Sequence, residues 1–218
     1  MAIRILPFRQ YSDHEVVNLY ALTDADVLET TTLADSAGGD AGVFVKVSDG
    51  DFNNDPITYQ TNTYLGDNSF PFLGGTAMYP QVNLKVTPAT SGAGCLGMTL
   101  LQTAKNDENG EKLLYNPTKQ TELQAALPGQ AVPVATRGVF TITEKAIDGH
   151  PDNSDFLTIG GGIKISANEG KVTGCDRDDT WAMGSVIGTG LNNNSDFRAP
   201  STGYFSGVYA VVKLNCDA

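Results

Sequence analysis

Hydrophobic positions along the chain fall in short runs, separated by clusters of glycine, proline, asparagine and aspartate. Residues 81–86 read Gln-Val-Asn-Leu-Lys-Val, where apolar and polar residues alternate as in a strand with one buried face. Comparable runs lie at residues 42–47, 96–101, 130–134, 138–143, 156–159, 162–166, 170–173, 185–188 and 204–214. This density of short runs, with turn-forming residues between them, predicts an all-β (mainly β) protein built as a barrel or a sandwich.

Residues 116–127 are the one segment for which we predict a short helix. Pro117 suits the first turn of a helix, and a Pro-Gly pair follows the segment and ends it. Leu123, Ala126 and Leu127 would then share one face of the helix. The pattern therefore predicts at most one short surface helix in a β-rich chain.

A second helix-start signal lies near the N-terminus and is ambiguous. Ser12 and Glu15 have the spacing of a capping box, which commonly opens a helix. The run that follows contains Val16, Val17 and Tyr20, and these residue types favour a strand. We therefore expect extended structure after the box, with a helix as the alternative.

The spacing of the runs changes once along the chain, around residues 115–130. Long polar loops precede this region, whereas closely spaced runs follow it. We predict an extended N-terminal arm or first strand at residues 1–22, a β-rich part with long loops at 23–127, and a small β-barrel at 128–218. The barrel of the C-terminal half is expected to pack against the other β-rich part.

Size and charge narrow the function classes. A chain of 218 residues is long enough to bury a sizeable core without cross-links. Its 14 Lys and Arg against 25 Asp and Glu give a formal net charge of −11, which repels phosphate backbones and makes a nucleic-acid partner improbable. No signal peptide or membrane segment is apparent, so we expect synthesis in the cytoplasm and no membrane partner.

The cysteines do not suggest a disulfide framework or a zinc site. Cys95, Cys175 and Cys216 are odd in number and widely separated, and none belongs to a CxxC pair. We expect reduced, buried thiols, with an interchain bridge through Cys216 as an alternative.

One acidic loop has the residue types of a cation site. Asp49, Asp51, Asn53 and Asp55 alternate as oxygen ligands do in the first half of a calcium loop. The turn glycine is absent, however, and Gln60 stands where a bidentate glutamate is needed. These four residues are weak metal candidates, a solvated turn is the preferred interpretation, and no cofactor is predicted.

Other chemically suggestive residues have simpler interpretations. Residues 176–179 form a second acidic cluster, which we expect to be a surface loop. His14 and His150 have no nucleophile beside them in a known motif, and the glycine run at 160–162 lacks the spacing of a phosphate loop. Trp181, the only tryptophan, is expected to be a core or interface anchor. No catalytic residue is predicted.

Two stretches resemble structural proteins of tailed-phage virions. Residues 5–22, ILPFRQYSDHEVVNLYAL, look like the start of virion proteins of phages that infect cyanobacteria. Residues 128–140, PGQAVPVATRGVF, are similar to the barrel of capsid decoration, or cement, proteins. The pattern continues with the GKVT turn at 170–173, the Ile-Gly pair at 187–188, and the apolar strand at 208–214. Residues 23–127 exceed what a compact cement barrel requires.

The resemblance implies a non-enzymatic protein on the capsid surface of a tailed bacteriophage. Proteins of this kind are commonly homotrimers. The resemblance implies that the chain binds the major capsid protein on the outside of the head and stabilises the capsid by bracing neighbouring capsomers. Apolar side chains of the N-terminal stretch could dock on a partner, with an ordinary first core strand as the alternative. These candidate interface residues are Ile3, Ile5, Phe8, Tyr11, Val16, Leu19 and Tyr20.

Two other functions remain open from the sequence. The first is another virion role, as a tail, collar or head-fibre subunit. The second, from a different class, is a calcium-dependent carbohydrate-binding module that uses the Asp49 loop and Trp181. A hydrolase with an unrecognised site is a third and weaker alternative.

Overall fold

The computed structural model describes residues 4–20, 41–48, 85–104, 111, 113–126, 131–149, 157–192 and 207–216. The strands among these are β1 (Ile5–Gln10), β2 (Val16–Tyr20), β3 (Phe44–Ser48), β4 (Lys85–Pro88), β5 (Gly97–Thr99), β6 (Gln102–Thr103), β7 (Ala125–Ala126), β8 (Ala131–Ala135), β9 (Arg137–Thr143), β10 (Gly162–Ile165), β11 (Val172–Cys175), β12 (Gly184–Asn192) and β13 (Gly207–Asn215). The helical elements are the 3-10 turns η1 (Asp13–Glu15) and η4 (Leu113–Tyr115) and the α-helix α2 (Pro117–Leu123). The all-β prediction is confirmed.

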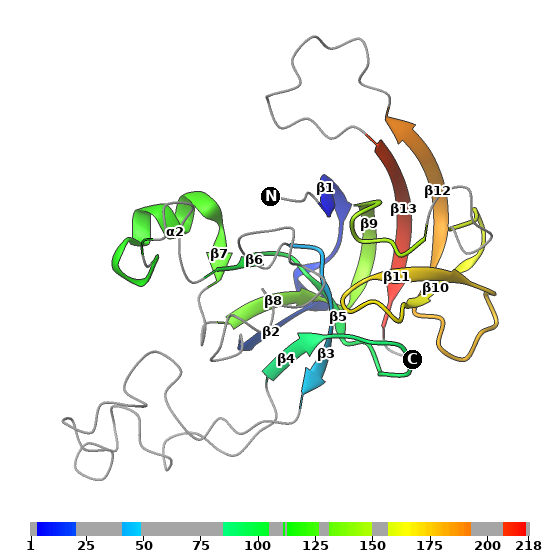
Figure 1. The fold of residues 1–218 in the computed structure, drawn as a ribbon, viewed down its shortest axis with the longest axis horizontal. Helices are drawn as coiled ribbons and strands as arrows, with labels where there is room; N and C mark the ends of the chain where they lie inside the picture. Colours follow the sequence, from blue (N-terminus) through cyan, green and yellow to red (C-terminus); the bar gives the residue numbers. More distant parts are fainter. Residues whose placement is uncertain are drawn as a thin grey trace.

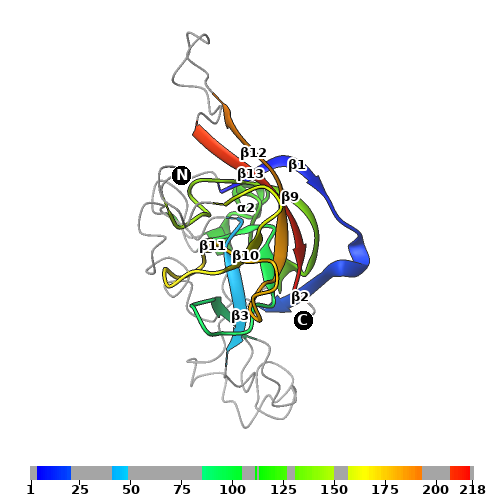
Figure 2. The same ribbon diagram turned by 90° about the vertical axis from the view of Figure 1, so that its right-hand side faces the viewer.

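Most strands of the C-terminal half, together with β1 from the N-terminus, form an open sheet (Figures 1 and 2). Its order is β1-β9-β13-β12-β10-β11, and every pairing within it is antiparallel. The long strands β9, β12 and β13 lie at its centre, and β1 and β11 are its edges. The predicted small barrel at residues 128–218 is therefore wrong, because the described strands of that half, apart from β8, belong to this open sheet.

The second layer is a ring of five strands, in the order β2-β4-β3-β5-β8, with β8 pairing back to β2. Four of the five pairings are antiparallel. The remaining link, between β2 and β4, is a single parallel residue pair, Tyr20 with Lys85. Most of this ring comes from the range predicted as the β-rich part with long loops, and β8 joins it from beyond residue 128.

The chain passes between the two layers at one corner. β1 leads through η1 into β2, while β8 leads through Thr136 into β9, so two antiparallel strands cross together from one layer to the other (Figure 2). The backbone N–H and the hydroxyl of Thr136 both donate to the carbonyl of Glu15, at 2.9 and 3.0 Å. The capping box of Ser12 and Glu15 is formed, but it caps this single 3-10 turn, and the strand expected after it is confirmed as β2. The predicted domain boundaries stay a prediction, although strand pairing joins the parts on either side of them.

Alternating side chains explain how the two layers share a core. In β3, Val45 points into the ring and packs with other valines, whereas Phe44 belongs to the cluster between the layers. Val134 and Ala135 in β8 divide in the same way. The cluster between the layers also receives the inward residues of the sheet, which are Phe140, Ile142, Ile163, Ile165, Val172, Val186, Ala210, Val212 and Leu214.

The helical lobe lies to one side of the two layers (Figure 1). The predicted helix is confirmed as α2, with Asn116 as its N-cap and Pro117 in its first turn. It ends earlier than predicted, because Gln124 adopts the left-handed conformation and Ala126 enters β7. Among the described residues, no helix is both long and apolar enough to cross a membrane.

One further local prediction fails. Residues 156–159 are predicted to be a strand, but the described Leu157 to Ile159 lead into a turn before β10. Leu157 is buried in the core between the layers, so its hydrophobicity reflects packing of a loop residue. A short apolar run does not distinguish that case from a strand.

Candidate functional site

One edge of the open sheet is β1, which has no second neighbour among the described strands. Ile5 pairs with Ile142 and Arg9 pairs with Phe140. The paired residues are thus four positions apart in β1 but only two positions apart in β9. The surplus residues include Pro7, which lacks a backbone N–H, and Phe8, which is 75% exposed. The irregularity therefore presents a large apolar side chain to solvent at a sheet edge.

Three of the predicted interface residues are instead partly buried against the core. Ile5, Tyr11 and Val16 pack on the cluster between the layers, and the Tyr11 ring stacks on the ring of Phe140 at 5.7 Å. The guanidinium of Arg9 lies 5.8 Å from the centre of the Tyr11 ring. β1 is thus anchored through Ile5, whereas its residues 7–10 are exposed, and docking of the N-terminal stretch on a partner stays a prediction.

The rest of that predicted set falls at the limits of the described structure. Ile3 lies outside the described residues. Leu19 and Tyr20 belong to β2, where their backbones pair with Val132 and Ala131, and their side chains are outside the description. Phe8 is therefore the member of the set that is plainly available to a partner.

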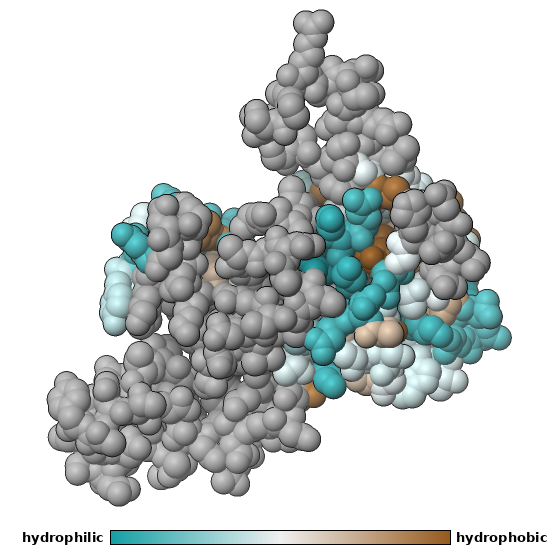
Figure 3. All heavy atoms as spheres, in the orientation of Figure 1, coloured by the Kyte–Doolittle hydropathy of each residue, from teal (hydrophilic) through white to brown (hydrophobic). Residues whose placement is uncertain are grey.

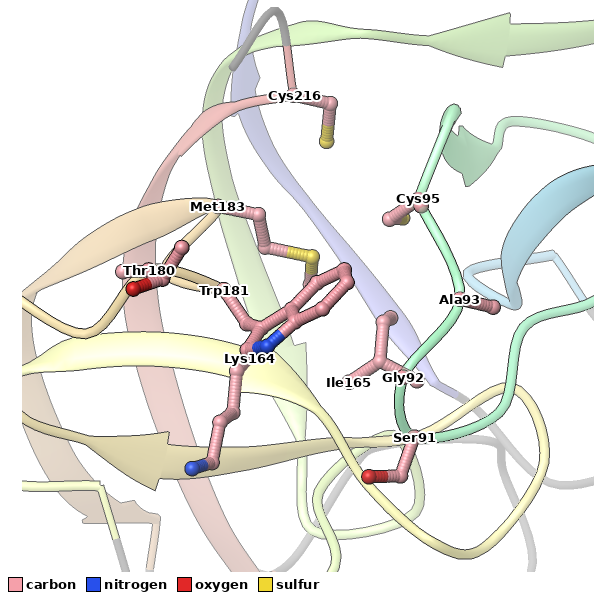
Figure 4. A pocket seen from close by; sticks show the side chains of 12 residues that line it. Ser91, Gly92, Ala93, Cys95, Lys164, Ile165, Thr180, Trp181, Met183 and Cys216 are labelled. Atoms are coloured by element: carbon pink, nitrogen blue, oxygen red, sulfur yellow. The ribbon is translucent and has the colours of Figure 1, made fainter.

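A second candidate surface is a cavity of about 230 Å³ beside Trp181, which we call the Trp181 cavity (Figure 4). Its lining comes from four separate segments of the chain. The lining residues are Ser91, Gly92, Ala93, Gly94, Cys95, Lys164, Ile165, Thr180, Trp181, Ala182, Met183 and Cys216. Ile165 and Met183 are buried, whereas Trp181 is 56% exposed, so the cavity has an apolar floor and an aromatic rim. The prediction of a core position for Trp181 is wrong, and a role as an interface anchor stays a prediction.

A tight turn at residues 176–182 holds Trp181 in place. The backbone N–H of Trp181 donates to Asp179 Oδ1 at 3.0 Å, and Lys164 Nζ donates to Asp179 Oδ2 at 2.8 Å. The hydrogen bond and charge of Lys164 lower the pKa of the Asp179 carboxyl, and the N–H of Trp181 lowers it further. The same interaction raises the pKa of Lys164. The predicted surface loop at 176–179 is confirmed, and one of its carboxylates is the support of the turn.

The thiols are partly buried, and none is in a disulfide. Cys95 and Cys216 line the Trp181 cavity, with the thiol of Cys95 donating to the carbonyls of Val45 and Gly97 at 3.6 Å. Burial raises the pKa of the Cys175 thiol, and the negative charge of Asp179 raises it further.

A polar network that the sequence did not suggest closes the turn between β10 and β11. Asp148 Oδ1 accepts from the Asn168 side chain at 2.8 Å, and Asp148 Oδ2 accepts from the hydroxyl of Ser166. Burial on its own raises the pKa of Asp148, but these hydrogen bonds and the charge of Lys171 outweigh it, so the pKa lies below the usual 3.8. Ser166 and Asn168 follow Asp148 by 18 and 20 positions in the sequence, and no sequence pattern signals contacts over such separations.

The remaining candidates give no further site among the residues that the structure describes. The weak metal candidates Asp49, Asp51, Asn53 and Asp55 lie outside the described residues, and so does His150. His14 is exposed within η1. Over the part of the chain that the structure describes, no three His, Cys, Asp or Glu side chains gather as metal ligands would. On the face in Figure 3, the described hydrophobic and hydrophilic residues are interspersed.

No protein-family model matches the chain, and no curated protein or solved structure matches it either.

Proposed function

We propose that the chain is a non-enzymatic structural protein of a tailed-phage virion, which binds the outside of the head and braces neighbouring capsomers. The observation that carries this proposal is the β1 edge, where Phe8 is 75% exposed on a strand with one unpaired side among the described strands. The resemblance of residues 5–22 and 128–140 to virion proteins supplies the identity of the partner, the major capsid protein.

The β1 edge has two means of holding a partner. Covering Phe8 removes apolar surface from water, at about 25 cal/mol per Å². The free side of the strand offers backbone N–H and C=O groups to an added strand, although Pro7 removes one donor. The binding free energy of such a contact is modest for one copy of the protein. The total stabilisation is large when the contact is repeated over a shell.

The anchoring of β1 makes such a contact efficient. Tyr11 stacks on Phe140, and Ile5 packs on the core, so the backbone that carries Phe8 is already ordered before binding. Less conformational entropy is then lost when a partner binds. Binding only to the assembled head would shift the equilibrium toward that state by mass action.

The net charge of −11 is compatible with this role. A strongly charged surface keeps a protein soluble at the high copy number needed to coat a shell. It also disfavours contact with the packaged DNA, so the protein would act from the outer surface.

Co-sedimentation with isolated heads and isolated tails of the encoding phage tests the proposal. We expect the wild-type chain to pellet with heads, and we expect Phe8→Ser to weaken binding about 10- to 30-fold, because the exposed part of a phenylalanine is worth about 2 kcal/mol. Ile159→Ser is the matched control, since Ile159 is 66% exposed but lies in the turn before β10, away from the β1 edge.

Binding to tails alone would move the protein to the tail or collar alternative. Equal losses for the two variants would show that the β1 edge is not the contact.

A further inference from the structure

The Trp181 cavity is not used by the proposed function, and its chemistry is distinct from that of the β1 edge. We infer that the cavity is a binding site for a planar aromatic ring that carries a hydroxyl group. The size of the cavity, the atoms of its walls and the position of Trp181 support this assignment, and none of them involves the virion role.

The cavity has the size of a single ring with one substituent. Its volume is about 230 Å³. An engineered apolar cavity of about 150 Å³ in another protein binds benzene, whereas sites for drug-sized ligands begin at about 300 Å³. A substituted benzene ring therefore matches this volume, and a larger fused or branched ligand would extend beyond it.

The walls are suited to an aromatic ring in particular. Figure 4 shows the Trp181 ring facing the segment from Ser91 to Cys95 across the hollow, with Met183 and Cys216 at one end. Aromatic pairs are favourable beyond their buried area, and so are contacts between a sulfur atom and a ring. A saturated ring of the same size would gain neither contribution.

The opposite end of the cavity is polar. Figure 4 shows the amino group of Lys164 and the hydroxyl of Ser91 directed to this end. Lys164 gives one hydrogen bond to Asp179, and an ammonium group has three donors. A hydroxyl on the ring would find donors and an acceptor there, which sets the expected orientation of the ligand.

The site is organised before the ligand arrives. Asp179 binds both the backbone N–H of Trp181 and the amino group of Lys164, so one side chain holds the backbone that carries the aromatic wall and the amino group of the polar end together. Gly92 and Gly94 on the facing segment leave open space where a Cβ would stand. Little reorganisation is required, which favours binding.

Titration with p-cresol, followed by nuclear magnetic resonance, tests the inference on the full chain. The chain has one tryptophan, so its indole N–H signal reports on Trp181 alone. We expect a saturable shift of this signal with a Kd of about 1 mM, a usual affinity for a ligand of this size. The matched control is 4-methylcyclohexanol, which has the same skeleton without the aromatic ring and should bind at least about tenfold more weakly.

Two variants test the proposed walls. Met183→Leu keeps the volume and removes the sulfur, and it should weaken p-cresol binding about three- to tenfold. Ser91→Ala removes the hydroxyl at the exposed polar end and should also weaken binding, with the fold unchanged. The absence of a saturable shift up to about 20 mM, equal shifts by the two compounds, or unchanged affinity in both variants would overturn the inference.

A second titration distinguishes the two sources of such a ring. If the peptide acetyl-Gly-Tyr-Gly-amide shifts the Trp181 signal as strongly as p-cresol, the natural ligand is a tyrosine side chain of a partner. If p-cresol binds and the peptide does not, the ligand is a free phenol. If neither p-cresol nor the peptide binds, the inference of an aromatic-ring site is refuted. The proposal of head binding through β1 would be unaffected by that result.

Discussion

Phe8 and Tyr11 lie three residues apart at the sheet edge, and their removal should have opposite consequences for folding and for binding. Phe8 is 75% exposed, so folding buries only about a quarter of its side chain. Full burial of a phenylalanine is worth about 2 to 3 kcal/mol, and Phe8→Ala should therefore change the free energy of unfolding by about 0.5 kcal/mol.

Tyr11 is half-buried and stacks on Phe140, which is fully buried. Loss of half of its apolar burial costs about 1 to 1.5 kcal/mol, and loss of the stacked pair costs about 1 kcal/mol more. Tyr11→Ala should thus destabilise the protein by about 2 to 2.5 kcal/mol.

Urea unfolding at 25 °C measures both values, and the slope of the free energy against urea should be the same in the two variants and the wild type. Head binding should show the reverse order, with Phe8→Ala losing more affinity than Tyr11→Ala. This comparison is made without urea, at a temperature where Tyr11→Ala is folded. If Phe8→Ala destabilised the chain as much as Tyr11→Ala, Phe8 would be a core residue and the β1 edge could not be a free surface.

Three further predictions concern positions elsewhere in the fold. Gly97→Ala would place a Cβ against the carbonyl oxygen of Ala135, well inside contact distance, so it should cost about 3 kcal/mol in urea unfolding, and a neutral effect would mean that β5 and β8 are not closely paired. Gln124→Gly should raise the free energy of unfolding by about 0.5 to 1 kcal/mol, because Gln124 has a φ of 49° at the end of α2, and calorimetry would show an increased Tm. The lowered pKa of Asp179 means that its contribution to stability is complete above the usual value of 3.8 and is lost as pH falls through the lower folded value. The fluorescence of Trp181 should therefore change below pH 3.8 in the wild type and stay level there in Asp179→Asn, and a change that persists in the variant would assign it to another group.

Local patterns were sufficient for most strands because the information lies within a few residues. The valine-rich run in residues 42–47 and the β-branched run in 138–143 correspond to β3 and β9. Asn116 and Pro117 likewise carry the start of α2 in their own side chains. A capping box before Val16 was ambiguous, since the same hydrogen bonds serve one 3-10 turn as well as a full helix.

The layer to which each strand belongs could not be predicted in the same way. Ile5 pairs with Ile142, more than 130 positions later, and nothing in either strand specifies that partner. β8 and β9 are separated only by Thr136, yet they lie in different layers. The barrel was therefore placed in the wrong half of the chain, although most of the strands themselves were recognised.

The candidate binding surfaces also depend on contacts between distant parts of the chain, which the sequence does not specify. The exposure of Phe8 follows from an irregular pairing of β1 around Pro7, and Trp181 is exposed on a turn whose backbone is held by a hydrogen bond to Asp179. The Trp181 cavity needs four segments to meet, including the C-terminal Cys216. Sequence alone indicated Phe8 as one of seven candidate interface residues and Trp181 as a core or interface anchor, but it did not indicate the neighbours that define what each can bind.

Labelling of the protein in intact virions, followed by electron cryo-microscopy, tests the virion assignment most directly. The account predicts label on the outside of the head, in many copies with the symmetry of the shell. Label confined to the tail, or particles that lack the protein altogether, would contradict it.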